Sequence, residues 1–148
     1  MKIGIANDHA GVSLKNEIVA YLKEKRTNVE IVNYGTDNND SVDYPDFAKA
    51  LCIDIKSGKI ETGILICGTG LGISISANKI KGIRCALCHE TFSAQFSKQH
   101  NDANVLALGA RVTGPGLALE IVNIWLDTKF EGGRHSKRVD KMMQLENL

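Results

Sequence analysis

The chain has 148 residues, of which 43% are hydrophobic and 24% are charged, and its formal net charge is +1. A chain of this length encloses one core, so we assign residues 1–148 to a single domain. The near-neutral charge excludes the broad basic field that would attract nucleic acid or an anionic membrane. Any anion site must therefore be built from a few local residues.

The distribution of apolar residues predicts a cytoplasmic protein. The apolar run at the N-terminus is too brief for a signal peptide, and no apolar stretch is long enough to span a bilayer. The four cysteines lie within apolar runs rather than in a loop-rich framework, which indicates reduced thiols. They are Cys52, Cys67, Cys85 and Cys88.

Short runs rich in β-branched residues alternate along the chain with segments of helical spacing. We predict strands at residues 2–6, 29–32, 63–67, 83–87 and 105–108. The helical segments contain Leu14, Ile18 and Leu22; Phe47, Leu51 and Ile55, with Pro45 marking the start and Gly58 the end; Phe92 and Phe96; Leu117, Ile121 and Ile124 behind Pro115; and a last helix over 136–148. This alternation indicates an α/β fold with a parallel sheet covered on both faces. Ligands of such sheets bind beyond the carboxyl ends of the strands.

The first candidate motif follows the first predicted strand and reads Asn7-Asp8-His9-Ala10-Gly11. Here a carboxylate can hold hydroxyl groups and an imidazole can hold an anion, helped by free N–H groups at a helix start. Asp8 can equally serve only as a helix cap. The sequence leaves both interpretations open.

A glycine-rich loop follows the third predicted strand and reads Cys67-Gly68-Thr69-Gly70-Leu71-Gly72. Glycines on alternate residues let the backbone turn tightly and present several N–H donors together. The spacing is not that of the dinucleotide fingerprint, because the third glycine comes one residue too early. A cysteine close to a helix N-terminus has its thiolate stabilised, and a thiolate can remove a proton from carbon while amides hold the enediolate oxygens. The alternative is a buried structural cysteine.

Further candidates lie in the second half of the chain. The segment His100-Asn101-Asp102-Ala103-Asn104 contains a histidine that can transfer protons near neutral pH, as the opening of a sugar ring requires. Arg134 and Arg138 lie four residues apart, on one side of a helix, where guanidinium groups can bind phosphate oxygens. Solvated arginines and a capping histidine are the alternatives.

Together these blocks resemble the type B ribose-5-phosphate isomerase family, which also contains allose-6-phosphate and galactose-6-phosphate isomerases. The resemblance runs nearly end to end. It rests on Asp8-His9-Ala10-Gly11, Asp43-Tyr44-Pro45, Cys67-Gly68-Thr69-Gly70-Leu71-Gly72, His100-Asn101-Asp102-Ala103-Asn104, Gly109-Ala110-Arg111 and Gly132-Gly133-Arg134-His135.

The resemblance implies a three-layer Rossmann-like fold with a five-stranded parallel sheet and an aldose–ketose isomerase acting on ribose 5-phosphate, or alternatively on a hexose 6-phosphate. It implies that Cys67 is the base, that His100 opens the furanose ring and that Thr69 shuttles protons between enediolate oxygens. The implied substrate-binding residues are Asp8, His9, Tyr44, Gly68, Gly70, Leu71, Gly72, Asn101, Arg111, Arg134 and Arg138.

Within that set the resemblance also assigns roles. Asp8 would hold sugar hydroxyls, while His9, Arg134 and Arg138 would receive the phosphate, with Arg111 contributing from across the interface. Family members are dimers or tetramers with active sites between subunits, so His100, Asn101 and Arg111 would serve the Cys67 of a neighbouring copy. Because this chain carries the whole set, a homo-oligomer is expected, with no nucleic-acid or membrane partner.

One branch of the family replaces the cysteine base by a glutamate at the position of Ile73, which cannot accept a proton. The chain therefore resembles the cysteine-using branch, whose mechanism needs no metal and no cofactor. No set of His, Cys and carboxylate residues has convincing ligand spacing along the sequence.

Two alternatives compete with these interpretations. Cys85 and Cys88 have the spacing of a redox or zinc pair, but in a strand residues three apart point to opposite faces. A non-catalytic sensor of phosphosugars or nucleotides could use the same glycine loop. Such a sensor has no need of a thiol and a histidine around one ligand.

Overall fold

A parallel sheet forms the centre of the computed structural model, which describes residues 1–148. Its strands are β1 (Lys2–Asn7), β2 (Glu30–Asn33), β3 (Thr62–Cys67), β4 (Cys85–Leu87) and β5 (Val105–Gly109). They are hydrogen-bonded in the order β2-β1-β3-β5-β4, and every neighbouring pair is parallel. The carboxyl ends of all strands therefore lie at one edge of the sheet.

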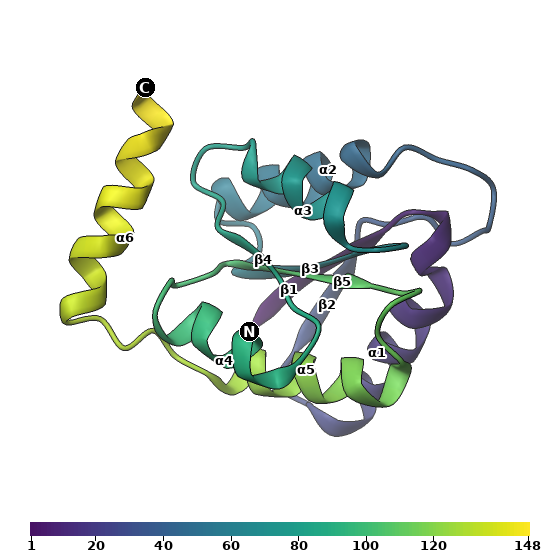
Figure 1. Cartoon of the computed structure of the whole chain (residues 1–148). Helices are drawn as coiled ribbons and strands as arrows, with labels where there is room; N and C mark the ends of the chain where they lie inside the picture. Colours follow the sequence, from purple (N-terminus) through teal and green to yellow (C-terminus); the bar gives the residue numbers. More distant parts are fainter.

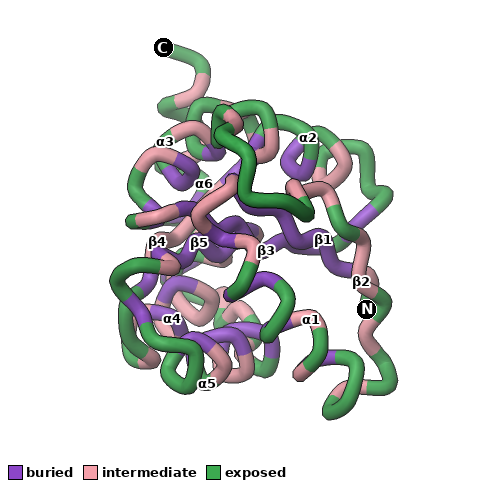
Figure 2. Tube along the Cα trace, turned by 90° about the vertical axis from the view of Figure 1, so that its right-hand side faces the viewer, coloured by how far each residue is buried: buried purple, intermediate pink, exposed green.

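Helices cover both faces of the sheet (Figure 1). The helices are α1 (Val12–Lys25), α2 (Tyr44–Lys56), α3 (Leu71–Asn78), α4 (Thr91–Gln99), α5 (Pro115–Asp127) and α6 (Arg134–Gln144), with short 3-10 turns at His9–Gly11 and Leu145–Asn147. One face packs against α1, α4 and α5, and the other packs against α2 and α3. Figure 2 shows the buried strands between these two helical layers. The three-layer, Rossmann-like α/β fold with a five-stranded parallel sheet is confirmed.

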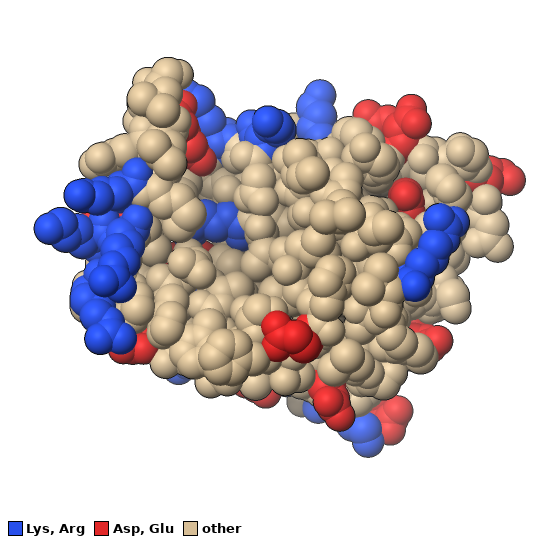
Figure 3. Space-filling view, viewed as in Figure 1, with Lys and Arg blue, Asp and Glu red and all other residues tan.

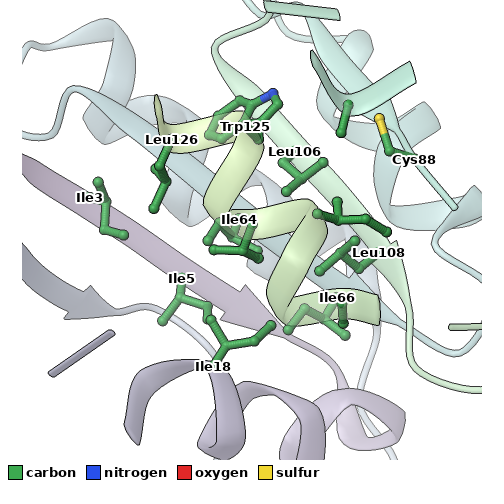
Figure 4. Close-up of a cluster of buried hydrophobic side chains, with 14 of the residues drawn as sticks. Ile3, Ile5, Ile18, Ile64, Ile66, Cys88, Leu106, Leu108, Trp125 and Leu126 are labelled. Atoms are coloured by element: carbon green, nitrogen blue, oxygen red, sulfur yellow. The ribbon is translucent and has the colours of Figure 1, made fainter. Parts of the chain in front are cut away.

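Successive side chains along each strand point to opposite faces of the sheet, and this divides the core into two clusters. In β3, Ile64 and Ile66 point into the larger cluster, whereas Leu65 and Cys67 point into the smaller one. The larger cluster encloses Trp125 of α5, which lies near Leu106 and Leu126 (Figure 4). Strands buried on both faces explain the nearly unbroken apolar runs in the sequence.

The predicted strands all form, with bounds that differ by no more than two residues at either end. Apolar spacing in the sequence does not reveal α3, because only Ile73, Ser74 and Ala77 of its eight residues are buried. Serines and a glycine interrupt its apolar pattern. Proline and glycine marked α2 correctly, since Pro45 lies in its first turn and Gly58 has a φ of 76° just beyond its end.

The last helix, α6, begins two residues earlier than predicted and stands apart from the sheet (Figure 1). Gly132 and Gly133 have φ angles of 69° and 55°, which lets the chain turn away from α5. Only His135 and Val139 of α6 are buried, and Met142 is exposed. None of the helices combines the length and the apolar character that a bilayer crossing requires.

Candidate active site

A pocket of about 460 Å³ opens at the carboxyl ends of β1 and β3. It is formed by the turn after β1, the glycine loop after β3, the N-terminus of α2 and the turn after β5. Its lining residues are Asp8, His9, Ala10, Val42, Asp43, Tyr44, Cys67, Gly68, Thr69, Gly72 and Arg111. The sequence motifs that follow separate strands therefore converge on one cavity, as the rule for parallel sheets requires.

Cys67 is the last residue of β3 and reaches the pocket although only 4% of its surface is exposed. Its Sγ accepts a hydrogen bond from the Gly70 N–H at 3.1 Å. Helix α3 begins at Leu71, so the free N–H groups of its first turn lie close to the sulfur. The sulfur therefore lies beside a backbone donor at the start of a helix.

The glycine loop approaches β5 so closely that two glycines are needed. Gly70 has a φ of 78°, and a Cβ there would lie 2.9 Å from the backbone carbon of Leu108. A Cβ on Gly109 would lie 2.5 Å from the carbonyl oxygen of Thr69. Within the loop, the Thr69 hydroxyl accepts the Leu71 N–H at 3.2 Å, which leaves its own proton free to donate.

The Gly109→Ala variant is expected to lose stability and activity together. The added Cβ must push the Thr69 backbone away, which displaces the loop that carries Cys67 and costs about 1–3 kcal/mol of unfolding free energy. Urea unfolding measures the loss of stability, and the turnover rate measures the loss of activity. Gly116→Ala is the matched control, because a Cβ at Gly116 meets no atom within 4 Å. A Gly109→Ala variant as stable as the control would contradict the packing argument.

The turn after β1 supports both interpretations of Asp8. Its Oδ1 accepts the Ala10 N–H at 2.9 Å, so Asp8 does cap the short helical turn, and its side chain also lines the pocket. The Nδ1 of His9 accepts the Val42 N–H at 3.2 Å. In the neutral ring the proton is therefore assigned to Nε2, which makes that nitrogen a donor.

The segment 34–43 between β2 and α2 is anchored by Asn7 and by Lys15, which no motif in the sequence marks. Lys15 of α1 is only 2% exposed, and its Nζ donates to the carbonyl of Thr36 at 2.6 Å and to Asp37. The hydrogen bond from Lys15 lowers the pKa of the Asp37 carboxyl. Asn7 also donates to the Thr36 carbonyl, at 3.0 Å. These contacts hold the segment that delivers Val42 and Tyr44 to the pocket.

Arg111 lies in the Cys67 pocket of its own chain, which corrects the expectation that it acts from a neighbouring copy. Its backbone N–H donates to the Gly68 carbonyl at 2.9 Å, and its guanidinium covers Gly68. The reason is the strand order, because β5 is the direct neighbour of β3. Tyr44 packs its ring against Gly72, where a Cβ would lie 2.5 Å from the ring.

A second cluster, away from this pocket, contains His100, Arg134 and Arg138. His100 follows α4 and stacks on His135 of α6 with ring centroids 4.0 Å apart. Arg134 and Arg138 lie close enough to His135 to lower its pKa, although burial and His100 lower it more. None of these residues lines the Cys67 pocket. The helix α6 also carries Lys137 and Lys141, and Figure 3 shows Lys and Arg gathered where Figure 1 draws α6.

Asn101 lies neither in the Cys67 pocket nor in the His100 cluster, but in a separate cavity. It lines a cavity of about 740 Å³ between the edge strand β4 and α6, together with Ile83, Met142 and Met143. This cavity contains neither Cys67 nor His9. Within one chain, the expected phosphate ligands are therefore divided between His9 at one place and the two arginines of α6 at another.

Two groups of possible metal ligands can be judged from their geometry. Cys85 packs with the smaller core cluster and Cys88 with the larger one, so this pair points to opposite faces, as predicted. His100, Glu131 and His135 bring ligand atoms within 4.8 Å of one another, which the spacing along the sequence did not reveal. The two imidazole rings are inclined by only 11°, so their lone pairs run side by side instead of converging on one ion.

Comparison with known proteins identifies the family. The family model described as ribose/galactose isomerase matches residues 3–142. Ribose-5-phosphate isomerase B of Escherichia coli is 50% identical over 145 residues, which cover 98% of this chain and 96% of that protein. The D-erythrulose-4-phosphate isomerase of Pectobacterium atrosepticum is 47% identical over 99% of this chain and 96% of its own length.

A solved structure agrees with both sequence comparisons. Ribose-5-phosphate isomerase B of Clostridium thermocellum superposes with a TM-score of 0.96 at 53% identity, covering 99% of this chain and 98% of that one. The resemblance drawn from the sequence motifs is thereby confirmed. The chain belongs to the ribose/galactose isomerase family, the aldose–ketose isomerases that include ribose-5-phosphate isomerase B.

Proposed function

We propose that the chain interconverts ribose 5-phosphate and ribulose 5-phosphate with Cys67 as the base. The observation that carries this proposal is the position of the Cys67 thiol. It opens onto a pocket that also holds a carboxylate, an imidazole and a guanidinium, and it receives the Gly70 N–H at 3.1 Å. The relatives named as ribose-5-phosphate isomerase B support the pentose substrate.

In the proposed reaction the Cys67 thiolate removes the proton from carbon 2 of the open-chain aldehyde. The electron pair moves onto the aldehyde oxygen and leaves a cis-enediolate, which the loop N–H groups stabilise. Thr69 passes a proton between the two enediolate oxygens, and the Cys67 thiol returns its proton to carbon 1. Every proton transfer is assigned to a group of the protein, so the proposal requires no metal and no cofactor.

The proposed site is completed by a second copy of the chain. His100 is assigned to ring opening, and Arg134 and Arg138 to the phosphate, yet these residues lie outside the pocket that holds Cys67. A symmetric dimer lets each copy supply its His100 cluster to the pocket of the other. His9 and Asp8 then bind from the same chain as Cys67, and Arg111 also acts from that chain.

The Arg138→Ala variant is expected to raise KM for ribose 5-phosphate about 10- to 100-fold, because hydrogen bonds to charged groups are worth about 1.5–3 kcal/mol. Its kcat should change little, since the phosphate does not react. Steady-state kinetics measure both constants. Lys23→Ala removes an equal charge from the exposed face of α1 and serves as the control. A fall in kcat without a rise in KM would assign Arg138 a different role.

A second candidate substrate is a hexose 6-phosphate such as allose 6-phosphate, bound at the same residues. It is favoured by the description of the matching family as ribose/galactose isomerase, because galactose is a six-carbon sugar. Substrate length depends on the distance between Cys67 and the arginines of the second copy. The deciding experiment compares kcat/KM for ribose 5-phosphate, allose 6-phosphate and D-erythrose 4-phosphate on the purified protein.

The fate of the carbon-bound hydrogens distinguishes an isomerase from a non-catalytic sensor of phosphosugars. An isomerase incorporates solvent deuterium or transfers hydrogen between the first two carbons, whereas a sensor binds the sugar phosphate and leaves its carbon-bound hydrogens in place. Binding of ribose 5-phosphate without any ribulose 5-phosphate would therefore overturn the proposal.

A further inference from the structure

The ring of His100 contacts two other aromatic rings. His135 stacks on it, with centroids 4.0 Å apart and planes inclined by 11°. The centroid of Phe96 lies 4.6 Å from that of His100, with the two planes inclined by 56°. Phe96 in turn contacts Phe92 at 4.6 Å. Contacts with two neighbouring rings restrict rotation of the imidazole about its side-chain bonds.

His135 is itself fixed by its surroundings. Only 4% of it is exposed, and its backbone N–H donates to the Gly132 carbonyl at 3.0 Å. Its Nε2 accepts a long hydrogen bond from Nε of Arg134, at 3.4 Å, and lies 4.0 Å from a carboxylate oxygen of Glu131. Glu131 accepts a 2.8 Å hydrogen bond from the side chain of Gln99, next to His100.

The surroundings of His135 favour its neutral form. Burial and the nearby His100 lower the pKa of His135, with smaller contributions from Arg134 and Arg138, while Glu131 acts in the opposite direction. A lowered pKa keeps His135 neutral at pH 7. A neutral ring can stack on His100 without the repulsion that two imidazolium ions would suffer.

We propose that His135 is a positioning residue for ring opening, which it serves by stacking on the imidazole of His100 and fixing its plane. The inference rests on the proposed function, because it assigns His135 to the step that His100 performs there. Ring opening needs a nitrogen aligned with the ring oxygen and the anomeric hydroxyl, and a small misplacement of such a group is costly. The stack removes the rotational freedom that would allow that misplacement.

The test compares a substrate that closes a ring with one that cannot. Ribose 5-phosphate closes a furanose through its fourth oxygen. Ribulose 5-phosphate stays open because its ring would need the oxygen that carries the phosphate. An enzyme with defective ring opening can still convert ribulose 5-phosphate and release the open aldehyde, which then closes in solution. The ratio of the two rates therefore reports the ring-opening step.

His135→Ala is expected to lower kcat on ribose 5-phosphate about tenfold or more and to change kcat on ribulose 5-phosphate less than about threefold. His135→Phe should restore most of the loss, because it replaces one stacked ring by another. Ser136→Ala, at the next position of α6, should behave like the wild type. Size-exclusion chromatography checks that all variants keep the same assembly.

Several outcomes would overturn the inference. Equal losses on both substrates, or a Phe variant as poor as the Ala variant, would show that stacking is not what His135 contributes. Stoichiometric zinc in the wild type that disappears in His135→Ala would make His135 a metal ligand instead. His100→Asn is measured alongside as the reference. If His100→Asn shows the selective loss on ribose 5-phosphate and His135→Ala does not, the positioning role of His135 is rejected while the proposed function stands. If the wild type converts neither substrate, the proposed function fails.

Discussion

The Cys67→Ala variant is expected to lose isomerase activity by about 10²–10⁴-fold, which is the usual contribution of a positioned general base. Alanine cannot take the proton from carbon 2, and no other basic side chain lies at the end of β3. Binding of ribose 5-phosphate should persist, because Asp8, His9 and Arg111 still line the pocket. The rate is measured by formation of ribulose 5-phosphate, and binding to the inactive variant by calorimetry.

Cys52→Ala is the matched control for this prediction. Cys52 lies in α2 within the same core cluster, and burial raises the pKa of its thiol to about 12. It therefore stays protonated at neutral pH and lies outside the pocket, so its loss should leave kcat nearly unchanged. Equal activity losses in both variants would point to a packing defect. Full activity in Cys67→Ala would remove the thiol from the mechanism.

Mixing two inactive variants is expected to restore activity if the site is shared between copies. In a mixed dimer of Cys67→Ala and His100→Asn, one pocket lacks both groups and the other has both. Random exchange of subunits gives mixed dimers in half of the population, so about a quarter of the wild-type activity should return. The measurement is turnover of ribose 5-phosphate after the two proteins are unfolded, mixed and refolded together.

The control for this experiment pairs two variants of the same pocket. Cys67→Ala and Asp8→Asn both alter the cavity at the ends of β1 and β3. Their mixed dimer has one altered group in each pocket, so no site is intact and no activity should return. Failure of the first pair to recover, with intact dimers, would place His100 and Cys67 in the same chain's site.

Local patterns in the sequence were sufficient to predict most of the fold. Apolar runs such as that of β3 predict buried parallel strands, because only a sheet covered on both faces needs side chains that are apolar on both sides. Pro45 and Gly58 marked the ends of α2 for conformational reasons that act within a few residues. The same logic failed at α3, where a short helix with interspersed serines has too weak a period to recognise.

The sequence by itself determined which residues end the strands and hence the chemistry available at the pocket: the thiol of Cys67, the amides that follow it, and Asp8 with His9. Only the tertiary structure decided which of the candidates meet. The strand order places Arg111 beside Gly68 of its own chain, and the turn at Gly132 carries Arg134 and Arg138 away with α6. Local preferences act over a few residues, whereas strand pairing and helix direction join residues far apart in the chain. Contacts such as the stack of His100 on His135 are therefore set by packing, which the spacing of residues does not encode.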